Sequence, residues 1–485
     1  MSAETLTLLL VAAHAVVVLV AAVVISARRS PSAAIAWILA IAFIPVIGIA
    51  WFLLVGAGRL PRSRREKQQQ VNRLALERDE SGWAVGHRDE WPEAFASAAQ
   101  LNRELGALPM VGGNRASLEG DYAETFRRMI GDIDAAVTVV NVEFYIFVLD
   151  DTTRPFVDAL ARAVARGVKV RVLSDHLSGF MYPHRRETAQ AFRDAGIEWH
   201  AMLPLRPFRG QWQRADLRNH RKLVTVDGRV GWTGSLNLID SSYLKTKNIK
   251  RGLHWHELMV RLEGPVVSEL DAVFVTDWYS ETDELLPFGD APAALPAPAA
   301  SDLLDAQVVP SGPSFENDNN LKLFVYLLQN ARQRISITSP YFVPDESTQL
   351  AIVTAASRGV DVELFVSEIG DQGGVFHAQR SYYSELLRTG VRIFMYPGPY
   401  ILHAKHVSID DDVAVIGSSN MDIRSFSLNM EVSVLVHGRG FVDELRLVED
   451  AYRAASRELT LDEWVKRPLA ARVGDALARL TSSLQ

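Results

Sequence analysis

The stretch His220-Arg221-Lys222, followed by Asp227 and then by Gly234-Ser235-Leu236-Asn237, recurs later as His403-Ala404-Lys405, Asp410 and Gly417-Ser418-Ser419-Asn420. Every spacing inside the two copies is the same: two residues from His to Lys, seven to Asp, fourteen to Gly and seventeen to Asn. One such match could arise by chance. Two matches in one chain indicate a duplicated functional unit, which decides the fold expected for the rest of the sequence.

The first copy has the pattern of a β-hairpin. Residues two apart on a strand point to the same face, so His220 and Lys222 share a face. Asp227 and the glycine after it are typical of a hairpin turn, and the returning strand brings Ser235 and Asn237 opposite the histidine. At the turn, a structural, hydrogen-bonding role for Asp227 is favoured over direct catalysis. The second copy predicts the same arrangement for its own residues, which are His403, Lys405, Asp410, Ser418 and Asn420.

These residue types suit a phosphodiester substrate. The lysines supply positive charge and the asparagine amides can donate to non-bridging oxygens, which stabilises charge on a phosphoryl group. Two histidines at one anionic site titrate as a coupled pair, so one can attack phosphorus while the other donates a proton to the leaving oxygen. One phosphodiester is then exchanged for another through phosphohistidine, and neither a metal nor a cofactor is expected. A carboxylate should orient each imidazole; Glu257 and Glu431 are the candidates, and ordinary surface carboxylates are the alternative.

Two long apolar runs precede the motifs. Residues 6–25 and 33–55 span 20 and 23 positions without a charge, so each is long enough to cross about 30 Å of hydrocarbon as a helix. A short polar turn at residues 28–32 separates them. A cleavable signal peptide is the alternative, but Glu4 is acidic where a signal peptide is basic, and a second run follows at once. Pro45 and Gly48 leave open a kinked or re-entrant second segment.

Charge predicts the orientation and disfavours one class of partner. Basic residues after the second run outnumber those in the turn, which places the large C-terminal part in the cytoplasm and predicts a multi-pass protein of the plasma membrane. Residues 1–75 hold eight Lys/Arg and two Asp/Glu, whereas the remainder carries a net charge of −13. An acidic globular part disfavours a nucleic-acid partner. The sequence has no cysteine, which excludes disulfides, thiolate metal sites and a cysteine nucleophile.

The rest of the chain predicts a duplicated α/β unit. A strand, a helix and a strand are expected at residues 136–147, 158–166 and 168–173, and again at 335–342, 350–357 and 360–366. We therefore expect a transmembrane hairpin at 1–58, a helical linker at 59–108, a first mixed-sheet domain at 109–290, an Ala/Pro-rich linker at 291–305 and a second mixed-sheet domain with a helical tail at 306–485. The two domains should be related by a pseudo-two-fold axis.

The paired motifs closely resemble those of the phospholipase D superfamily. Three further stretches resemble bacterial cardiolipin synthases, namely residues 36–48, 339–345 and 420–426. The resemblance implies two phospholipase-D-like α/β domains and an active site made of the six motif residues His220, Lys222, Asp227, His403, Lys405 and Asp410. It also implies that His220 is the nucleophile and His403 the acid and base. The implied reaction joins two phosphatidylglycerol molecules into cardiolipin and releases glycerol at a membrane.

Some features depart from that family's usual pattern. Ser235 stands where many synthases have glycine, Glu257 where aspartate is common, and residues 243–247 lead into an unusual basic insertion. These departures leave open which molecule accepts the phosphatidyl group. A phospholipase D or a phosphatidylserine synthase, with water or serine as acceptor, is therefore the alternative function. A membrane scaffold with an inactive site is disfavoured by two intact motifs. The sequence does not indicate an oligomeric state.

Residues 206–222 carry six basic side chains immediately before and within the first motif. A solvated loop is the more frequent meaning of such a run. The alternative is a patch for anionic lipid headgroups, with Phe208 and Trp212 entering the membrane interface.

Overall fold

The computed structural model describes residues 2–27, 31–56, 60–79, 91–106, 108–206, 211, 213–287, 303–315 and 318–480. They belong to two units. The N-terminal unit comprises Met1–Arg59 with Arg214–Asp216, and the main unit comprises Leu60–Gln213 with Leu217–Gln485. Residues 28–30 of the predicted turn at 28–32, most of the Ala/Pro-rich linker, and both Phe208 and Trp212 lie outside the described residues.

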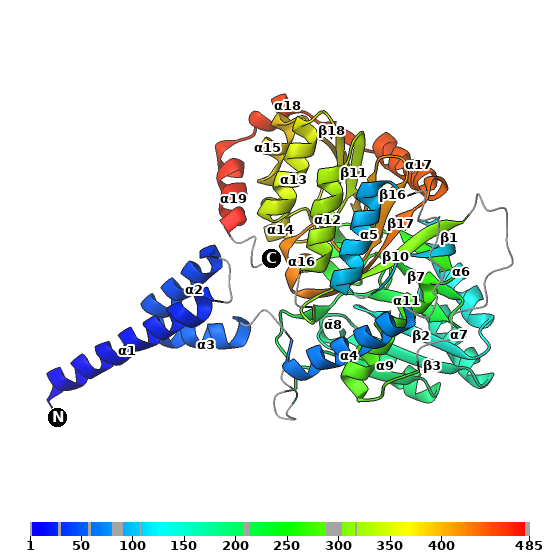
Figure 1. The fold of residues 1–485 in the computed structure, drawn as a ribbon, viewed down its shortest axis with the longest axis horizontal. Helices are drawn as coiled ribbons and strands as arrows, with labels where there is room; N and C mark the ends of the chain where they lie inside the picture. The colour runs from blue at the N-terminus through cyan, green and yellow to red at the C-terminus, as the bar shows by residue number, and fades with distance from the viewer. Residues whose placement is uncertain are drawn as a thin grey trace. The chain divides into compact units, whose positions relative to one another are not determined.

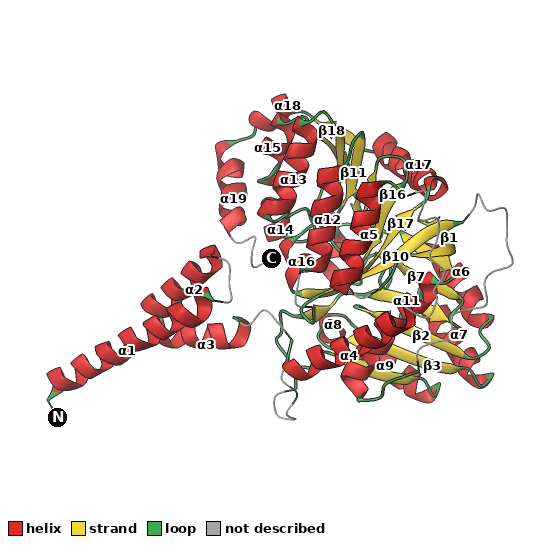
Figure 2. Ribbon diagram, viewed as in Figure 1, coloured by secondary structure: helices red, strands yellow, loops and turns green. Residues whose placement is uncertain are grey.

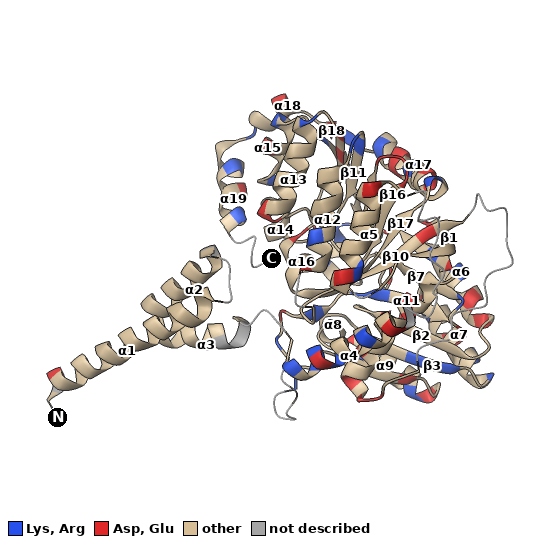
Figure 3. Ribbon diagram, in the orientation of Figure 1, with Lys and Arg blue, Asp and Glu red and all other residues tan. Residues whose placement is uncertain are grey.

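The N-terminal unit contains one helix that could span a membrane. Helix α1 (Ala3–Ser26) is long and apolar enough to cross, and among the described helices it alone passes this test of length and hydropathy. Neither it nor the next two helices carries a lysine or arginine, and Glu4 in the first turn of α1 is their one acidic residue, so Figure 3 draws these helices almost entirely in tan.

The second apolar run forms two short helices, α2 (Pro31–Phe43) and α3 (Pro45–Val55). Pro45 has no N–H to continue the helical ladder and its ring opposes the preceding turn, so the helix stops at this point. Helix α3 then folds back along α2, because the rings of Trp37 and Phe52 lie 5.3 Å apart and a Cβ on Gly48 would be 2.6 Å from the Ala40 carbonyl oxygen. The expected single helix over residues 33–55 is therefore wrong, and the run has the break that Pro45 and Gly48 left open in the sequence.

In the main unit, strands from both halves of the sequence join one 16-stranded sheet within the described residues. Strands β1 (Val111–Glu119) and β10 (Leu304–Ser311) are antiparallel neighbours at its centre. On one side of this pair follow β9 (Met259–Glu263), β7 (Val230–Gly234), β6 (Lys222–Val226), β2 (Val139–Phe144), β3 (Lys169–Asp175) and β4 (Glu198–Met202). On the other side follow β17 (Asn429–His437), β16 (Val413–Gly417), β15 (His406–Ile409), β11 (Arg334–Thr338), β12 (Asp361–Ser367), β13 (Arg392–Tyr396) and β18 (Arg457–Leu459).

The sheet is mixed, as the sequence predicts. Strands β2, β3 and β4 are parallel to one another, as are β11, β12 and β13, whereas the hairpin strands pair antiparallel. The expected strands and helices at 136–173 and 335–366 are confirmed in kind and order, with β2, α7 and β3 in the first half and β11, α13 and β12 in the second. The halves are not separate bodies, because one hydrophobic core draws on both, including Val260 and Leu270 of the first half and Val432 and Leu445 of the second.

Helices pack against the sheet in each half (Figures 1 and 2). The first half contributes α6 (Tyr122–Asp134), α7 (Arg154–Ala165), α8 (Ser178–Met181), α9 (Arg185–Asp194), α10 (Thr246–Lys250) and α11 (Val266–Thr282). The second half contributes α12 (Asn319–Asn330), α13 (Glu346–Ser357), α14 (Gly373–Arg380), α15 (Tyr383–Arg388), α16 (Ile423–Ser427), α17 (Arg439–Ala455), α18 (Leu461–Val465) and α19 (Leu469–Leu480). Three short strands complete the unit. β5 (Arg218–Asn219) pairs with β17 and is the sixteenth strand of the sheet, while β8 (His254–His256) and β14 (Tyr400–Leu402) pair with each other.

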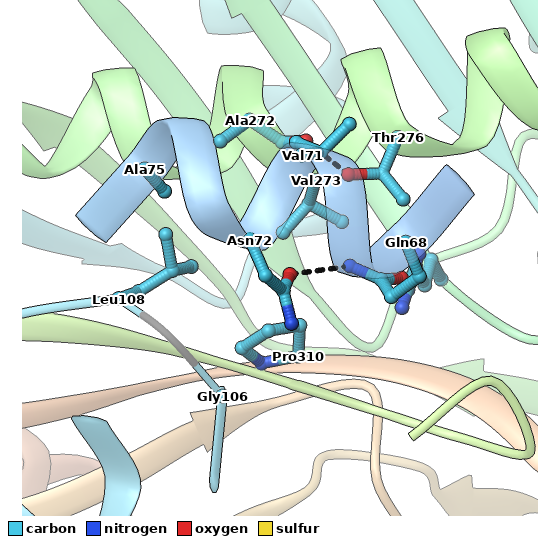
Figure 4. A pocket seen from close by; sticks show the side chains of 11 residues that line it. Gln68, Val71, Asn72, Ala75, Gly106, Leu108, Ala272, Val273, Thr276 and Pro310 are labelled. Atoms are coloured by element: carbon cyan, nitrogen blue, oxygen red, sulfur yellow. Dashed lines mark hydrogen bonds between the residues drawn. The ribbon is translucent and has the colours of Figure 1, made fainter. Parts of the chain in front are cut away.

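The described part of the expected linker at 59–108 is largely helical and belongs to the main unit. It contains α4 (Arg62–Asp79) and α5 (Glu93–Gly106). Helix α4 lies along α11, where Arg64 pairs with Glu281 at 2.8 Å, and the two helices enclose a cavity of about 10 Å³, enough for roughly one water (Figure 4). On α5, the Asn102 amide donates to the Val308 carbonyl of β10 at 3.1 Å. The second expected linker ends earlier than residue 305, because β10 already begins at Leu304.

Candidate active site

Both sequence motifs form the predicted hairpins. Strands β6 and β7 pair antiparallel with Val226 opposite Val230, and β15 and β16 pair with Ile409 opposite Val413. Asp227 and Gly228 adopt φ of 52° and 63° in the first turn. Glycine accepts this left-handed region freely and aspartate tolerates it better than most residues, which explains why the chain reverses there.

Each motif histidine is held by backbone contacts to the opposite half. The His220 N–H donates to the Met430 carbonyl at 2.8 Å, next to the parallel pairing of β5 with β17. The His403 N–H donates to the His256 carbonyl at 2.7 Å, next to the parallel pairing of β14 with β8. In both cases the accepting residue directly precedes a predicted orienting glutamate, so the glutamate is carried to the histidine of the other half.

Two crossed histidine–glutamate pairs result. His220 Nδ1 lies 2.9 and 3.0 Å from the Glu431 carboxylate oxygens, and His403 Nδ1 lies 2.8 Å from both oxygens of Glu257. Both carboxylates are buried, while 13% of the His220 side chain and 6% of the His403 side chain stay exposed. A neutral imidazole that donates its Nδ1–H to a carboxylate leaves Nε2 as the free nitrogen, which is the atom available for chemistry.

The electrostatics keep both imidazoles neutral near pH 7. Burial lowers the pKa of His220 to about 4 and that of His403 to about 4, against the opposing effect of each partner carboxylate. Burial alone would raise the pKa of Glu257, but the His403 ring and Lys405 bring it down to about 2. Burial would likewise raise the pKa of Glu431, but His220 and Lys222 bring it below the ordinary value. Each pair is therefore a carboxylate facing a neutral imidazole, ready to stabilise an imidazolium.

The two motif lysines join this cluster. Lys222 Nζ donates to the His220 carbonyl at 2.5 Å, and Lys405 Nζ donates to the His403 carbonyl at 2.6 Å. Burial lowers the pKa of Lys222 to about 7 and that of Lys405 to about 8, and each lysine also senses the glutamates of both pairs. The two half-sites therefore act on one another electrostatically, and an anionic phosphate placed between them would favour the charged form of both lysines.

The two motif aspartates lie away from this cluster, at the far ends of the hairpins. Five strand positions, about 17 Å, separate Asp227 from Lys222 along the chain. Its carboxylate accepts hydrogen bonds from the backbone N–H groups of Val137, Thr138 and Val139 at 2.7–2.8 Å. Asp410 accepts from the N–H groups of residues 332–334 at 2.7–3.1 Å. Each aspartate thus holds the turn of its hairpin to the start of the adjoining strand, β2 or β11.

This geometry predicts a stability role for the aspartates. Asp227→Ala leaves three N–H groups without their acceptor and should lower the free energy of unfolding by about 2–3 kcal/mol, because hydrogen bonds to charged groups are among the stronger ones. Hydrogen bonding also lowers the pKa of Asp227 despite its partial burial, so this contribution is present above the ordinary carboxyl pKa and is lost as pH falls further. Denaturant unfolding measures the loss. The folded Asp227→Ala variant should keep its turnover within a few-fold of the parent enzyme. A turnover below 1% of the parent value would contradict a purely structural role.

The predicted substrate-binding serines and asparagines make several internal hydrogen bonds. Ser418 Oγ donates to Glu431 at 2.6 Å, and Ser235 Oγ exchanges hydrogen bonds with the backbone of Leu258 at 2.9 and 3.2 Å. The Asn237 amide donates to the Tyr243 hydroxyl at 2.8 Å and accepts from the Ile146 N–H at 3.3 Å. Asn420, the last residue of the second motif, is buried. A direct role of these four residues in binding substrate stays a prediction.

The basic stretch before the first motif is partly turned inward. Arg218 is buried against Asp175 at 3.3 Å, and Arg221 is 1% exposed and bonds Asp277, the Glu431 carbonyl at 3.0 Å and the Ser311 carbonyl at 3.3 Å. A headgroup patch that includes these two arginines is therefore wrong. Arg221 instead ties His220 to strands of the other half.

Aromatic rings surround the histidines, and sequence analysis assigned no site role to most of them. Tyr145 lies edge-on to His220 with ring centroids 5.2 Å apart, while Tyr341 and Tyr243 lie 6.3 and 6.1 Å from His403. Among the described residues no group of three or more His, Asp or Glu side chains is arranged to hold a metal ion.

Comparison with known proteins assigns the family. The family described as "Cardiolipin synthase, PLD-like domain" matches residues 129–278 and 324–448, which include both motifs and both glutamates. The chain belongs to this family. It is 32% identical to cardiolipin synthase A of Proteus mirabilis and 33% identical to cardiolipin synthase A of Serratia proteamaculans, and each alignment covers 94% of this chain and 94% of the relative.

A solved structure supports the fold. The crystal structure of phosphatidylserine synthase from Haemophilus influenzae superposes with a TM-score of 0.59 at 15% identity, over 80% of this chain and 99% of that chain. At this identity the likeness concerns the fold alone, namely the mixed α/β architecture of phospholipase-D-like proteins.

Proposed function

We propose that this protein is a cardiolipin synthase, a phosphatidyltransferase that joins two phosphatidylglycerol molecules into cardiolipin and releases glycerol. The observation that carries the proposal is the pair of crossed histidine–glutamate contacts, His220 with Glu431 and His403 with Glu257, flanked by two buried lysines. This arrangement supplies two imidazoles, two orienting carboxylates and two cations, as an exchange of phosphodiesters requires. The family membership supplies the lipid substrate.

The chemistry follows from the free nitrogen of each imidazole. His403, neutral in the free enzyme, takes up a proton as the anionic phosphodiester binds beside it. His220 Nε2 then attacks phosphorus, the bond to the first glycerol oxygen breaks, and His403 gives that oxygen its proton. The phosphatidyl group is then held on His220. In the second step His403 takes the proton from a hydroxyl of the second phosphatidylglycerol, whose oxygen attacks phosphorus and frees His220. Lys222 and Lys405 stabilise the charge on the non-bridging oxygens in both steps.

The site residues of this proposal are the histidines, lysines and glutamates, with Asp227 and Asp410 as supports of the hairpins. The resemblance between the halves supports a pseudo-two-fold relation of two phospholipase-D-like repeats, near residues 109–290 and 306–485. Strands follow the same order outward from β1 and from β10, and each half gives the other one glutamate and one backbone acceptor for a histidine N–H.

A reaction with a single lipid tests which molecule accepts the phosphatidyl group. Purified protein incubated with phosphatidylglycerol alone should yield cardiolipin and glycerol in equal amounts, measured by mass spectrometry of the lipids and an enzymatic glycerol assay. Phosphatidic acid as the sole lipid product would contradict the proposal and favour a phospholipase D. Phosphatidylserine formed on adding serine, with no cardiolipin in its absence, would favour a phosphatidylserine synthase. A matched reaction with His220→Ala gives the background for each product.

We further propose that the protein is anchored in the plasma membrane by α1, with the main unit in the cytoplasm. The apolar length of α1 supports the anchor, and the basic residues that follow α3 support the orientation. The second complete crossing that would make the protein multi-pass stays a prediction, since the second run is the broken pair α2 and α3.

A further inference from the structure

Four large apolar side chains are exposed beside the two motif histidines. Phe180 and Met181 of α8 are 58% and 57% exposed. Ile249 of α10 and Tyr400 of β14 are 56% and 45% exposed. Single exposed apolar residues are ordinary on a protein surface, whereas a group of them in one place, with polar residues around it, marks a contact surface.

Helix α8 lies between tyrosines of the two half-sites. At its start, Ser178 Oγ donates to the carbonyl of Tyr145, whose ring is edge-on to the first motif histidine. At its end, the Tyr182 ring lies 6.2 Å from the Tyr243 ring, which in turn lies 6.1 Å from the second motif histidine. The two exposed residues of α8 stand between these contacts in the chain, so they are exposed next to the aromatic neighbours of both histidines.

Helix α10 continues this surface from α8 and joins the two halves. The Lys245 ammonium, at the N-cap of α10, lies 5.1 Å from the centre of the Tyr182 ring. Lys247 and Arg251 donate to the backbone carbonyls of residues 370–371, in the other half, at 3.0–3.1 Å. These contacts hold the exposed isoleucine of α10 beside α8 and beside the other half.

Tyr400 joins the same surface through the strand that follows α10. It is the register partner of His254 in the parallel pair of β14 with β8, and the two rings lie 6.4 Å apart. A small hydrophobic cluster that includes Tyr243, Trp255 and Ile401 is buried here. Because the cluster draws on residues from both halves, it fixes these strands beside α10.

Four cations accompany these apolar side chains. We define the α8–α10 surface as the exposed apolar residues Phe180, Met181, Ile249 and Tyr400 together with the exposed basic residues Lys245, Lys247, Lys250 and Arg251. The hydrogen bonds that α10 makes to residues 370–371 go to neutral carbonyl groups, so these bonds leave both positive charges in place. Apolar side chains set among cations are the composition that binds the interface of an anionic bilayer.

The proposed substrate decides between a bilayer and a protein as the partner of this surface. A phosphatidyl group reaches the histidines with its acyl chains still in hydrocarbon only if the residues beside the site approach the bilayer. Leaving the bilayer would instead expose two acyl chains to water, which the hydrophobic effect strongly opposes. A surface beside the site that is both apolar and basic meets this requirement.

We propose that the α8–α10 surface docks on an anionic bilayer, so that a lipid phosphate reaches the histidines while its acyl chains stay in the membrane. Phe180, Met181 and Ile249 enter the interfacial region, and the four basic side chains contact lipid headgroups. This contact is separate from the anchor in α1, because it belongs to the main unit and adjoins the catalytic side chains. The inference rests on the proposed lipid substrate.

The sequence has no cysteine, so a dye can be attached at a single introduced position of the full-length protein. Phe180→Cys and Ile249→Cys, each labelled with the fluorophore NBD, are reconstituted in liposomes of phosphatidylglycerol and phosphatidylcholine. Doxyl-labelled acyl chains should quench both labels about threefold more strongly than the label on Val137→Cys, because a docked side chain enters the acyl boundary. Val137 is the matched control, since it is 73% exposed and its N–H bonds Asp227 at the far end of the first hairpin.

The three labels separate the possible outcomes. Equal quenching of all three would overturn the proposal, because the α8–α10 surface would then have no preference for the bilayer. An absence of quenching at Phe180→Cys and Ile249→Cys would also overturn it and would leave the surface to a protein partner. In liposomes of phosphatidylcholine alone, quenching of these two labels should fall by about half or more, because the cations lose their anionic lipids. Unchanged quenching there would contradict the role of the basic residues.

Kinetics gives a second, independent readout. The combined substitution Phe180→Ser, Met181→Ser and Ile249→Ser should slow glycerol release from phosphatidylglycerol in liposomes by about tenfold, since the burial of one such side chain is worth roughly that factor. Release from dihexanoyl-phosphatidylglycerol, dissolved as monomers, should change by less than about twofold, because a monomer needs no docking. Leu447→Ser, at a position of α17 that is 70% exposed, should alter neither rate.

Equal slowing with both lipids would assign the three residues to folding or to catalysis and would overturn the proposal. Quenching needs no turnover, so docking is measured even if phosphatidylglycerol proves not to be the substrate. A failure of the proposed function is therefore distinguishable from a failure of docking.

Discussion

His220→Ala and His403→Ala should each lower the rate of phosphatidyl transfer from phosphatidylglycerol by about 10⁴-fold or more, because each removes a group that forms or breaks a bond in the reaction. His220 supplies the nitrogen that attacks phosphorus, and His403 supplies and recovers the proton. Their Nδ1 atoms are bonded to Glu431 and Glu257, which leaves Nε2 as the reacting atom that each substitution removes. Product formation with radiolabelled phosphatidylglycerol measures the loss.

His377→Ala is a control for this prediction. His377 lies outside both motifs and bonds Asp475 at 2.8 Å on the face that packs against α19. Its replacement should leave the transfer rate within a few-fold. Retention of even a tenth of the parent activity by His220→Ala or His403→Ala, in a variant with unchanged circular dichroism, would contradict a two-histidine mechanism.

Glu431→Gln and Glu257→Gln should each lower kcat by about 10²- to 10³-fold, because an amide keeps the shape but cannot stabilise the imidazolium that forms in each step. The Michaelis constant for phosphatidylglycerol should change little, since both carboxylates are buried and contact Nδ1, not the reacting Nε2. Steady-state kinetics in mixed micelles gives both parameters. Since the pairs are crossed, each variant removes from one half a group that serves the other half.

A buried glutamate elsewhere separates this effect from lost stability. Glu363 is 1% exposed and pairs with Arg334, Arg392 and Arg453, away from both histidines. Glu363→Gln should destabilise the fold, as measured by denaturant unfolding, and keep kcat within a few-fold. A similar fall of kcat in Glu363→Gln and in Glu431→Gln would mean that the effect is one of folding.

The hairpins could be predicted from the sequence because they rest on local chemistry. Alternation along a strand, a turn-forming Asp-Gly and a repeated spacing determine which residues face His220 within one motif. The same local reasoning assigned Asp227 to the turn, which its hydrogen bonds to the start of β2 explain. The identity of the two orienting glutamates followed from their position after each motif.

The crossing of the pairs could not be predicted in this way. Spacing within a motif says nothing about which half supplies the partner, and the exchange depends on β5 pairing with β17 and β14 with β8, contacts between residues far apart in the chain. For the same reason, the charge pattern of the sequence does not predict which basic side chains are buried. Arg221 looks like a surface cation in the sequence, yet its carbonyl partners come from β10 and β17, so it is turned inward. A hydropathy profile likewise does not show the helix break at Pro45, because this proline lies inside an uncharged apolar run.

In the proposed mechanism, His220 carries the phosphatidyl group from the donor lipid to the acceptor lipid. The most direct measurement is to mix the enzyme with phosphatidylglycerol, quench within one turnover at alkaline pH, where phosphohistidine survives, and locate the added mass by peptide mass spectrometry. We expect a phosphatidyl adduct on the peptide that contains His220 in the parent enzyme, and none in His220→Ala. An adduct on His403 in the parent enzyme, or turnover with no adduct on either histidine, would contradict it.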